Sequence, residues 1–393
     1  ALDVEECPLL DTTGQVLAEE AVASFDIPPA DNSAMDGFAV RAEDVQTASP
    51  ENPVRLKVLE DLPAGSMTST PVGKDEAIRI MTGAPMPTGA DIAVPVEETE
   101  PAGEREILVL TSLDKGRNVR FRGEDVNEGQ LVLSAGMPLH PPEIGLLAAL
   151  GHQEIEIARI PEVAILATGD EIADLGESLT PGRIRNSNSY SLAAQVIGCG
   201  AKIKLLGVAA DTPESIRQKL EEGFQSDVLL TTGGVSVGDY DYVKATFQEV
   251  GAEIKLWQVA IRPGKPLVFG RRGSKPFFGI PGNPVATVVS FEEFVRPALR
   301  KMMGHTHLCN STVMARLEER IEKREGRRYY IRVRLRRENG EYLATTTGPQ
   351  GSGILTSLVS AHGLAIFSEE ITALDAGEIV PVRLLPWTMG EML

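Results

Sequence analysis

Residues 227–238, DVLLTTGGVSVG, join an apolar run directly to a glycine-rich turn. The run at 227–231 predicts a buried strand, and residues 241–250, closed by Gly251, predict the helix that follows. A strand, a tight turn and a helix N-terminus together form an anion site, because free N–H groups and the helix dipole point at the ligand. This stretch therefore predicts an α/β fold with an oxyanion ligand.

Two similar turns follow, IRPGKP at 261–266 and GIPGNP at 279–284, each beside an apolar run. Asn283 is a favourable N-cap and Pro284 a favourable first helical residue, so a helix is predicted from here to about residue 303. Such turns bring backbone N–H groups close to a ligand. One glycine turn alone is a weak signal, and three in succession are a strong one.

Together the three turns resemble the motifs of the molybdopterin molybdenumtransferase family, which includes MoeA and the E domain of gephyrin. The matching residues are GGVSVG at 233–238 with Asp241-Tyr242, RPGKP at 262–266 and PGNP at 281–284. The resemblance spans nearly the whole chain and implies insertion of molybdate into adenylated molybdopterin with release of AMP. It implies these substrate-binding residues in the turns: Gly233, Gly234, Ser236, Arg262, Lys265, Pro281, Gly282, Asn283 and Pro284.

Three further loops match the same family, and each also has a purely structural interpretation. DNSAMDG at 31–37 is either an exposed turn before a strand or a loop that presents a functional carboxylate. RIMTGAPMP at 79–87 is either a strand that ends in a loop or the source of a functional hydroxyl. RFRGED at 120–125 is either a solvated, salt-bridged hairpin or part of a cleft. By resemblance the catalytic residues of these loops are Asp36, Thr82 and Asp125.

Composition limits the class of protein. The chain has 393 residues and an apolar fraction of 42%, which suffices for several hydrophobic cores. Its formal charge of -18 argues against nucleic acid or an anionic membrane surface as a partner. Three widely spaced cysteines, Cys7, Cys199 and Cys309, argue against disulfides and structural zinc and favour a reducing cytoplasm.

Targeting segments are not expected either. No apolar run reaches the ~18 residues of a membrane span, and no signal peptide opens the chain. Family members usually have a helix before the position of Ala1, so a short leading segment is expected to be missing from this sequence.

Residues 158–308 alternate predicted strands with predicted helices. The strands are 163–167, 202–206, 228–230 and 277–280, and the helices are 188–198, 213–223 and 241–250. This alternation predicts a mostly parallel sheet with helices on both faces, whose ligands lie beyond the carboxyl ends of the strands. The motif turns follow those ends, as TGDE at 168–171, Asp211, GGVS at 233–236 and PGNP at 281–284.

Acidic residues gather at the same predicted edge. Glu171, Asp211 and Asp241 are predicted metal ligands and, by resemblance, catalytic residues, and Asp239 lies near them. Carboxylates repel a phosphate unless a cation lies between them, so Mg²⁺ with oxygen ligands is inferred. The alternative for Asp211 and Asp239 is that they cap helices.

Residues 309–393 carry β patterns separated by turns and suggest a small barrel or sandwich. The arginine-rich run at 324–337 is interpreted as the solvated face of a strand rather than as a nucleic-acid surface. His305 and His307 are spaced like metal ligands but have no evident third partner, so a loop pair is favoured.

The resemblance adds three cleft residues from this region: Arg327, Arg332 and Ser352. Arg332, with Arg262 and Lys265, is expected to hold phosphate or molybdate oxygens, because the acidic chain needs local cations to bind an anion. The chain departs from the family pattern at Arg262, where lysine is frequent, at Ala286, where serine is common, and at 348–353, which lacks histidine.

The predicted architecture is a multidomain α/β plus β protein with four domains. They are a linking domain (1–24 and 126–157), an inserted β-rich domain (25–125), a three-layer α/β molybdopterin-binding domain (158–308) and a β-barrel-like domain (309–393). As in the family, an elongated homodimer is expected, in which the Asp36, Thr82 and Asp125 loops close the cleft of the partner subunit. The molybdopterin adenylyltransferase and apo-molybdoenzymes are expected protein partners.

Two other functions are alternatives. A molybdopterin adenylyltransferase shares the α/β domain and its Gly-Gly-Val-Ser turn, but it does not need the Asp36 loop, the Thr82 loop or the C-terminal β-domain. A dimeric scaffold like the gephyrin E domain gives no reason for acids clustered at strand ends.

Overall fold

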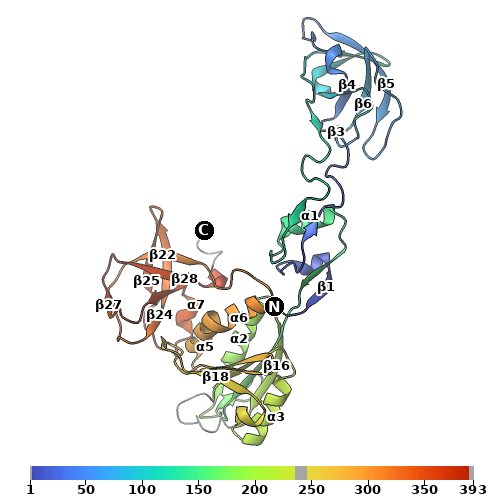
Figure 1. Cartoon of the computed structure of the whole chain (residues 1–393). Coiled ribbons are helices and arrows are strands. Elements are labelled where there is room, and N and C mark those ends of the chain that lie inside the picture. The colour runs from blue at the N-terminus through green and yellow to red at the C-terminus, as the bar shows by residue number, and fades with distance from the viewer. Residues whose placement is uncertain (1, 235–245, 389–393) are drawn as a thin grey trace. The chain divides into compact units, whose positions relative to one another are not determined.

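The computed structural model describes residues 2–234 and 246–388 (Figure 1). The chain divides into a larger unit, residues 1–18, 136–141 and 154–393, and a smaller unit, residues 19–135 and 142–153. The predicted linking domain is divided between these units, and the four-domain division stays a prediction. Ser236, Asp239 and Asp241 lie outside the described residues.

The larger unit contains a six-stranded sheet in the order β16-β13-β17-β21-β20-β18. Its strands are β16 (Lys202–Ala209), β13 (Glu162–Thr168), β17 (Val228–Thr232), β21 (Lys275–Ile280), β20 (Val268–Arg272) and β18 (Glu253–Trp257). The first four are parallel, and antiparallel pairings add β20 and β18. Because helices cover both faces, β17 is buried along its whole length, which confirms the predicted mostly parallel α/β sheet.

Helices pack on both faces of this sheet (Figure 1). One face carries α2 (Ser187–Ile197), α5 (Pro284–Ser290) and α6 (Arg296–Met302), and the other carries α3 (Pro213–Gly223) with the helical residues 246–249. Side-chain caps start the first helix of each face. Asn186 Oδ1 accepts a hydrogen bond from Ser189 N, and Thr212 Oγ1 accepts one from Ser215 N.

The helix predicted after Asn283 forms, but a π-helical turn, Phe291–Val295, joins α5 to α6. Pro284 lies in the first turn as predicted. The prediction for Asn283 is only half right, because this residue stands at the N-cap position without a side-chain hydrogen bond. The reason is that the N–H of Val285, which an N-cap side chain would bind, donates to the carbonyl oxygen of Ser352 at 3.0 Å.

The C-terminal strands form the predicted barrel. It is closed, because β24 (Arg328–Glu338) pairs with both β25 (Glu341–Thr346) and β26 (Gly363–Phe367), while β22 (Thr312–Leu317) and β28 (Ile379–Leu384) complete the ring. β19 (Ile261–Arg262) joins the start of β24 in parallel. Arg334 and Arg336 are exposed on β24, as predicted for a solvated face, whereas Arg332 is buried.

The smaller unit is built on a second six-stranded sheet with apolar clusters on its faces. In sheet order its strands are β7 (Ile92–Pro95), β4 (Gly37–Val40), β6 (Glu76–Ile80), β5 (Val54–Leu62), β9 (Glu106–Val109) and β8 (Thr99–Gly103). Shorter pairs are β2 (Ala21–Val22) with β11 (Leu131–Leu133), and β3 (Asn32–Ser33) with β10 (Val119–Arg120). Helix α1 (Pro141–Ala149) places Leu146 against a small cluster around Ala23 and Val126. No regular helix forms between residues 26 and 41.

The first residues of the chain form a short strand and a tight turn. β1 (Val4–Pro8), which pairs with β12 (Glu154–Ala158), ends at Pro8, and Leu9–Thr12 form a 3₁₀ turn. The hydroxyl of Thr12 donates to the Leu9 carbonyl oxygen at 2.6 Å and stabilises this turn. Within the two described ranges, no helix combines the length and the apolar character that a bilayer crossing needs.

Candidate active site

Four turns meet at the carboxyl ends of the parallel strands, and we call this edge the rim. Asp170 follows β13 and Asp211 follows β16, and each backbone N–H donates to the carboxylate of the other, at 3.4 and 3.1 Å. Gly233 N donates to Ile280 O at 3.2 Å, which joins the turns after β17 and β21. Asn188 Nδ2 donates to Gly282 O at 2.8 Å and ties α2 to the same edge. The predicted convergence of these turns is therefore confirmed.

Gly233 is required by the rim geometry. Its φ of +90° lies in the left-handed region that favours glycine. A Cβ atom on this residue would lie 2.5 Å from the backbone oxygen of Thr168, which cannot rotate away. Beside this contact, Thr168 Oγ1 and Asn188 Oδ1 are buried and have no hydrogen-bond partner among the described residues. Because buried polar atoms are normally bonded, the rim retains capacity for a polar ligand.

The carboxylates of the rim form only part of the predicted metal site. Asp211 and Glu171 are exposed. The Glu171 carboxylate folds back over Gly169, because a Cβ atom placed on that glycine would lie 2.5 Å from Glu171 Oε2. No group of three potential ligands, whether Asp, Glu, His or Cys, forms among the residues described. Asp241 lies outside that set. The oxygen donors present are of the type that a hard divalent cation prefers.

The turn with Arg262 and Lys265 lies where β19 joins β24. Both side chains are exposed. Arg262 Nη1 donates to the hydroxyl of Tyr329 at 3.2 Å, and its guanidinium carbon lies 5.2 Å from the centre of the Tyr329 ring. A Cβ on Gly264 would lie 2.9 Å from Ser290 Oγ, so this turn packs closely against α5. Hydrogen bond and cation–π contact together orient the guanidinium.

A pocket of about 430 Å³ adjoins this turn, and its charged lining is mainly basic. The charged residues are Arg262, Lys323, Arg324, Arg332 and one carboxylate, Glu322. Arg327 is not part of the lining. It is half-buried, and its carbonyl oxygen accepts a hydrogen bond from Lys323 Nζ at 3.0 Å.

Arg332 is the most unusual cation near the rim, because its side chain is 1% exposed and contacts neutral acceptors. Its Nε donates to Ser357 Oγ at 2.8 Å, and its Nη2 donates to the carbonyl oxygens of Pro349 and Gly351 at 3.3 and 3.1 Å. Burial lowers the pKa of Arg332 to about 10, so the group is still protonated at pH 7.

The same interactions position Ser352. The Arg332 side chain binds the loop just before Ser352, and the Ser352 carbonyl oxygen accepts from Val285 N at the start of α5. Gln350 strengthens this connection, since its side chain accepts from Arg332 N at 2.9 Å and donates to Arg332 O at 3.2 Å. Ser352 therefore lies against the start of α5, just after the turn of residues 281–284, and Arg332 holds the loop that leads to it.

In the smaller unit, Asp36 and Thr82 lie in direct contact. Asp36 Oδ1 accepts from both the backbone N–H and the hydroxyl of Thr82, each at 2.7 Å. These two bonds lower the pKa of the exposed Asp36 carboxyl. In the 120–125 segment Asp125 N donates to Ile27 O, and Arg122 forms its ion pair with Asp26 rather than with a neighbour in the hairpin.

Comparison with known proteins assigns the family. Three sequence profiles match, described as MoeA N-terminal region (domain I and II) over residues 1–151, probable molybdopterin binding domain over 164–301 and MoeA C-terminal region (domain IV) over 314–385. The chain is 39% identical to molybdopterin molybdenumtransferase 2 of Mycobacterium tuberculosis, over 94% of this chain and 92% of that protein. It is 34% identical to the molybdopterin molybdenumtransferase of Bacillus subtilis, over 98% and 93%.

The chain belongs to the molybdopterin molybdenumtransferase family. It is therefore a transferase of molybdenum cofactor biosynthesis. The fold agrees, because the crystal structure of the molybdopterin biosynthesis MoeA protein from Pyrococcus horikosii superposes with a TM-score of 0.83 at 34% identity, covering 98% of this chain and 95% of that one. The family expected from the sequence motifs is thus confirmed.

In this molybdopterin molybdenumtransferase family member, three polar residues of the site were not found by sequence reasoning. Asn188 bridges α2 and the Gly282 turn, while Gln350 and Ser357 hold Arg332. Asn188 lies between serines in NSNSY at 186–190, a composition typical of any helix start. Their roles depend on side-chain direction across long sequence separations, which a local motif does not encode.

The contact between Asp36 and Thr82 leads to a pH prediction. In Thr82→Val, loss of the hydroxyl should raise the pKa of Asp36 towards its ordinary value, while the backbone N–H bond persists. Because the pKa of Asp36 is lowered in the folded protein, its contact with Thr82 stabilises the fold at pH values above the unfolded-state pKa of about 3.9. This stabilisation is lost as the pH falls from there through the lower pKa of the folded protein. A carboxyl ¹³C NMR titration measures the shift. Thr99→Val, which removes a hydroxyl that donates to the Val96 carbonyl oxygen, is the control. An unchanged Asp36 titration in Thr82→Val would contradict the assignment.

Proposed function

We propose that this transferase inserts molybdate into adenylated molybdopterin and releases AMP, with Mg²⁺ as the metal cofactor. The observation that carries the proposal is that the buried guanidinium of Arg332, whose hydrogen-bond partners are neutral, lies near the glycine turns of the rim. The chain as a whole has a formal charge of -18. A molecule this acidic repels phosphate and molybdate unless local cations and free amide N–H groups bind them. Arg262 and Lys265, both exposed beside the same loop region, supply further positive charge.

The proposed division of roles follows from these positions. Backbone N–H groups of the turns containing Gly233, Gly234 and residues 281–284 bind oxyanion oxygens, together with Arg262 and Lys265. Bound Mg²⁺ would neutralise phosphate charge and polarise the P–O bond, with Asp241, Glu171 and Asp211 as its proposed protein ligands. Release of AMP breaks a P–O–P bridge, and a water molecule supplies the new oxygen and gives up a proton. Ser236, Arg327 and Ser352 are proposed substrate contacts.

We also propose that the protein acts as a cytoplasmic homodimer. In that arrangement Asp36, Thr82 and Asp125 of one subunit close the cleft of the other. The pairing of Asp36 with Thr82 supports this, because a carboxylate held ionised by two donors is a preorganised group rather than a random surface acid. The protein would receive adenylated molybdopterin from the molybdopterin adenylyltransferase and would pass the finished cofactor to apo-molybdoenzymes.

The test measures AMP release by purified protein from adenylated molybdopterin with molybdate and Mg²⁺. Asp36→Ala and Asp241→Ala should fold normally and lose AMP release. Asp114→Ala, an exposed aspartate elsewhere in the smaller unit, should keep it. An adenylyltransferase would instead consume ATP, and a scaffold would give neither reaction. Full activity of Asp36→Ala or Asp241→Ala would overturn the role of that residue.

A further inference from the structure

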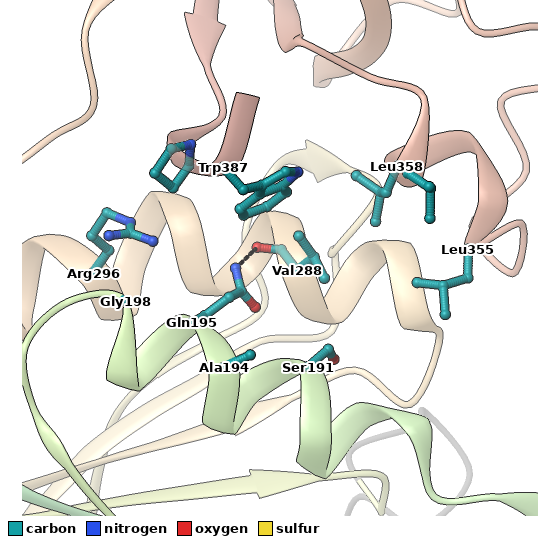
Figure 2. Close-up of a pocket in the computed structure, with 11 residues that line it drawn as sticks. Ser191, Ala194, Gln195, Gly198, Val288, Arg296, Leu355, Leu358 and Trp387 are labelled. Atoms are coloured by element: carbon teal, nitrogen blue, oxygen red, sulfur yellow. Dashed lines mark hydrogen bonds between the residues drawn. The ribbon is translucent and has the colours of Figure 1, made fainter. Parts of the chain in front are cut away.

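The larger unit contains hollows of different chemistry. The hollow beside α2 has a volume of about 560 Å³ and mainly apolar walls (Figure 2). The pocket of about 430 Å³ beside Arg262, which we call the basic pocket, is instead lined by several cations, among them Lys323. Its acidic residue, Glu322, is paired with Arg320 at 3.0 Å. The basic pocket therefore favours an anion, in agreement with the proposed role of Arg262.

Lys323 is a buried cation to which the proposed reaction gives no role. The residue is 9% exposed and follows β23 (Ile321–Glu322). Its Nζ donates to the backbone carbonyl oxygens of Arg327, Glu369 and Arg324, at 3.0, 3.2 and 3.5 Å. An ammonium group has three N–H donors, so these neutral acceptors account for all of them. Lys323 thus joins the 324–327 turn to the segment of Glu369 and keeps no donor for a ligand.

The ring of Tyr329 connects Lys323 with Arg262. Lys323 Nζ lies 5.1 Å from the centre of this ring, and the guanidinium carbon of Arg262 lies 5.2 Å from the same point. Arg262 Nη1 also donates to the Tyr329 hydroxyl at 3.2 Å. Tyr329 is 8% exposed, so the surrounding barrel core restricts the ring. One buried aromatic side chain therefore makes cation–π contacts with a buried cation and with an exposed one.

The backbone around Arg262 is already fixed by strand pairing. β19 and the start of β24 pair in parallel, and in this register Arg262 lies beside Tyr329. What remains to be set is the direction of the long Arg262 side chain, which is exposed. An exposed arginine ordinarily samples many rotamers and loses that freedom when it binds a ligand. Contacts that orient the side chain in advance reduce this loss and raise the affinity.

We propose that Lys323 is a positioning residue of the oxyanion site. Lys323 holds the Tyr329 ring, and the ring with its hydroxyl orients the Arg262 guanidinium for an oxyanion in the basic pocket. This role rests on the proposed function, in which Arg262 binds molybdate or phosphate oxygens. Lys323 acts through Arg262 and not by contact with the anion, because its own donors are engaged by carbonyl oxygens.

The test measures molybdate affinity of the full chain by equilibrium dialysis, and AMP release gives the KM for molybdate and kcat. We expect Lys323→Met to raise the Kd and the KM for molybdate about tenfold, with a smaller change in kcat. Lys275→Met is the matched control. Lys275 Nζ also donates to backbone carbonyl oxygens, those of Phe224 and Gln225, but it does not line the basic pocket, so the affinity should be unchanged.

A double-mutant cycle distinguishes positioning from a general effect on charge or stability. In the Arg262→Met background, Lys323→Met should change the Kd by less than about twofold, because a residue that acts through Arg262 has little effect once Arg262 is absent. Tyr329→Phe keeps the ring but removes the acceptor of the Arg262 hydrogen bond, so it should weaken binding only when Arg262 is present. Tyr329→Phe also takes the place of Lys323→Met if urea denaturation shows that the methionine variant is unfolded.

Three results would overturn the role of Lys323. They are an unchanged molybdate affinity in the variant, an equal loss of affinity with and without Arg262, and an absence of molybdate binding by the unaltered chain. Saturable molybdate binding with the expected coupling between Lys323 and Arg262, but without AMP release, would instead refute the proposed reaction and support the positioning role.

Discussion

Gly233→Ala is expected to destabilise the protein and to abolish its transferase activity. A non-glycine residue at positive φ costs about 1–3 kcal/mol. The added Cβ would in addition lie 2.5 Å from Thr168 O, which belongs to the backbone of β13. Two turns of the rim would have to separate to relieve this contact. We expect a total loss of at least about 3 kcal/mol of unfolding free energy. Urea denaturation and the AMP-release assay measure the two effects.

Gly176→Ala is a matched control for this change. Gly176 has the same φ of +90°, and a Cβ there would have no atom within 4 Å. It should therefore show only the cost of the backbone conformation, with activity retained. The difference between the two variants isolates the contact with Thr168. Equal unfolding free energies for the two variants would show that the rim accommodates a methyl group and would remove the argument for close packing.

Arg332→Met is expected to lower AMP release by about two orders of magnitude, the usual cost of losing a positioned donor near a reacting anion. It removes three hydrogen bonds to Ser357 and to the 349–351 loop and also removes a buried positive charge. The unfolding free energy should change by less than about 2 kcal/mol, because the lost bonds are offset by relief of the desolvation of the charge. Steady-state kinetics and chemical denaturation separate the two quantities.

Two further variants show how Arg332 acts. Arg334→Met, at an exposed position of the same strand, should change neither activity nor stability by much. Arg332→Lys keeps the charge but cannot form the same set of bonds to the loop. If Arg332 acts mainly by its charge, the lysine variant should recover most of the activity. If it acts mainly by holding the loop, lysine should behave like methionine, and Ser357→Ala should show a milder form of the same defect.

Local sequence predicted the elements well where an apolar run ended in a turn signal. The strands at 163–167 and 228–230 and the helix at 213–223 lie where their patterns placed them, because each carries its own start and stop residues. The errors arose where a contact from afar replaced a local one. Asn283 has the right position for a cap but no capping bond, since Val285 N is bound by Ser352 O from the barrel.

The candidate site shows the same division. The motifs named Asp36 and Thr82, and a direct contact joins these two residues, which are distant in sequence. The alternation of arginine along β24 predicted a solvated face, which holds for Arg334 and Arg336. The prediction of a solvated face fails at Arg332, because the side chain of Arg332 contacts the loop of residues 349–351, which leads back to α5. Periodicity describes which residues share a face of a strand but not what covers that face.

By itself the sequence determined the α/β core and the order of the turns at the rim, because apolar periodicity and glycine spacing are local properties of the chain. It indicated the family through the resemblance of its turn motifs to those of known members. The tertiary structure alone decided that Gly233 must be glycine because of Thr168 and that Arg332 is buried among neutral acceptors. These features depend on the packing of segments far apart in the chain, and that packing is settled only when the sheet, its helices and the barrel are assembled.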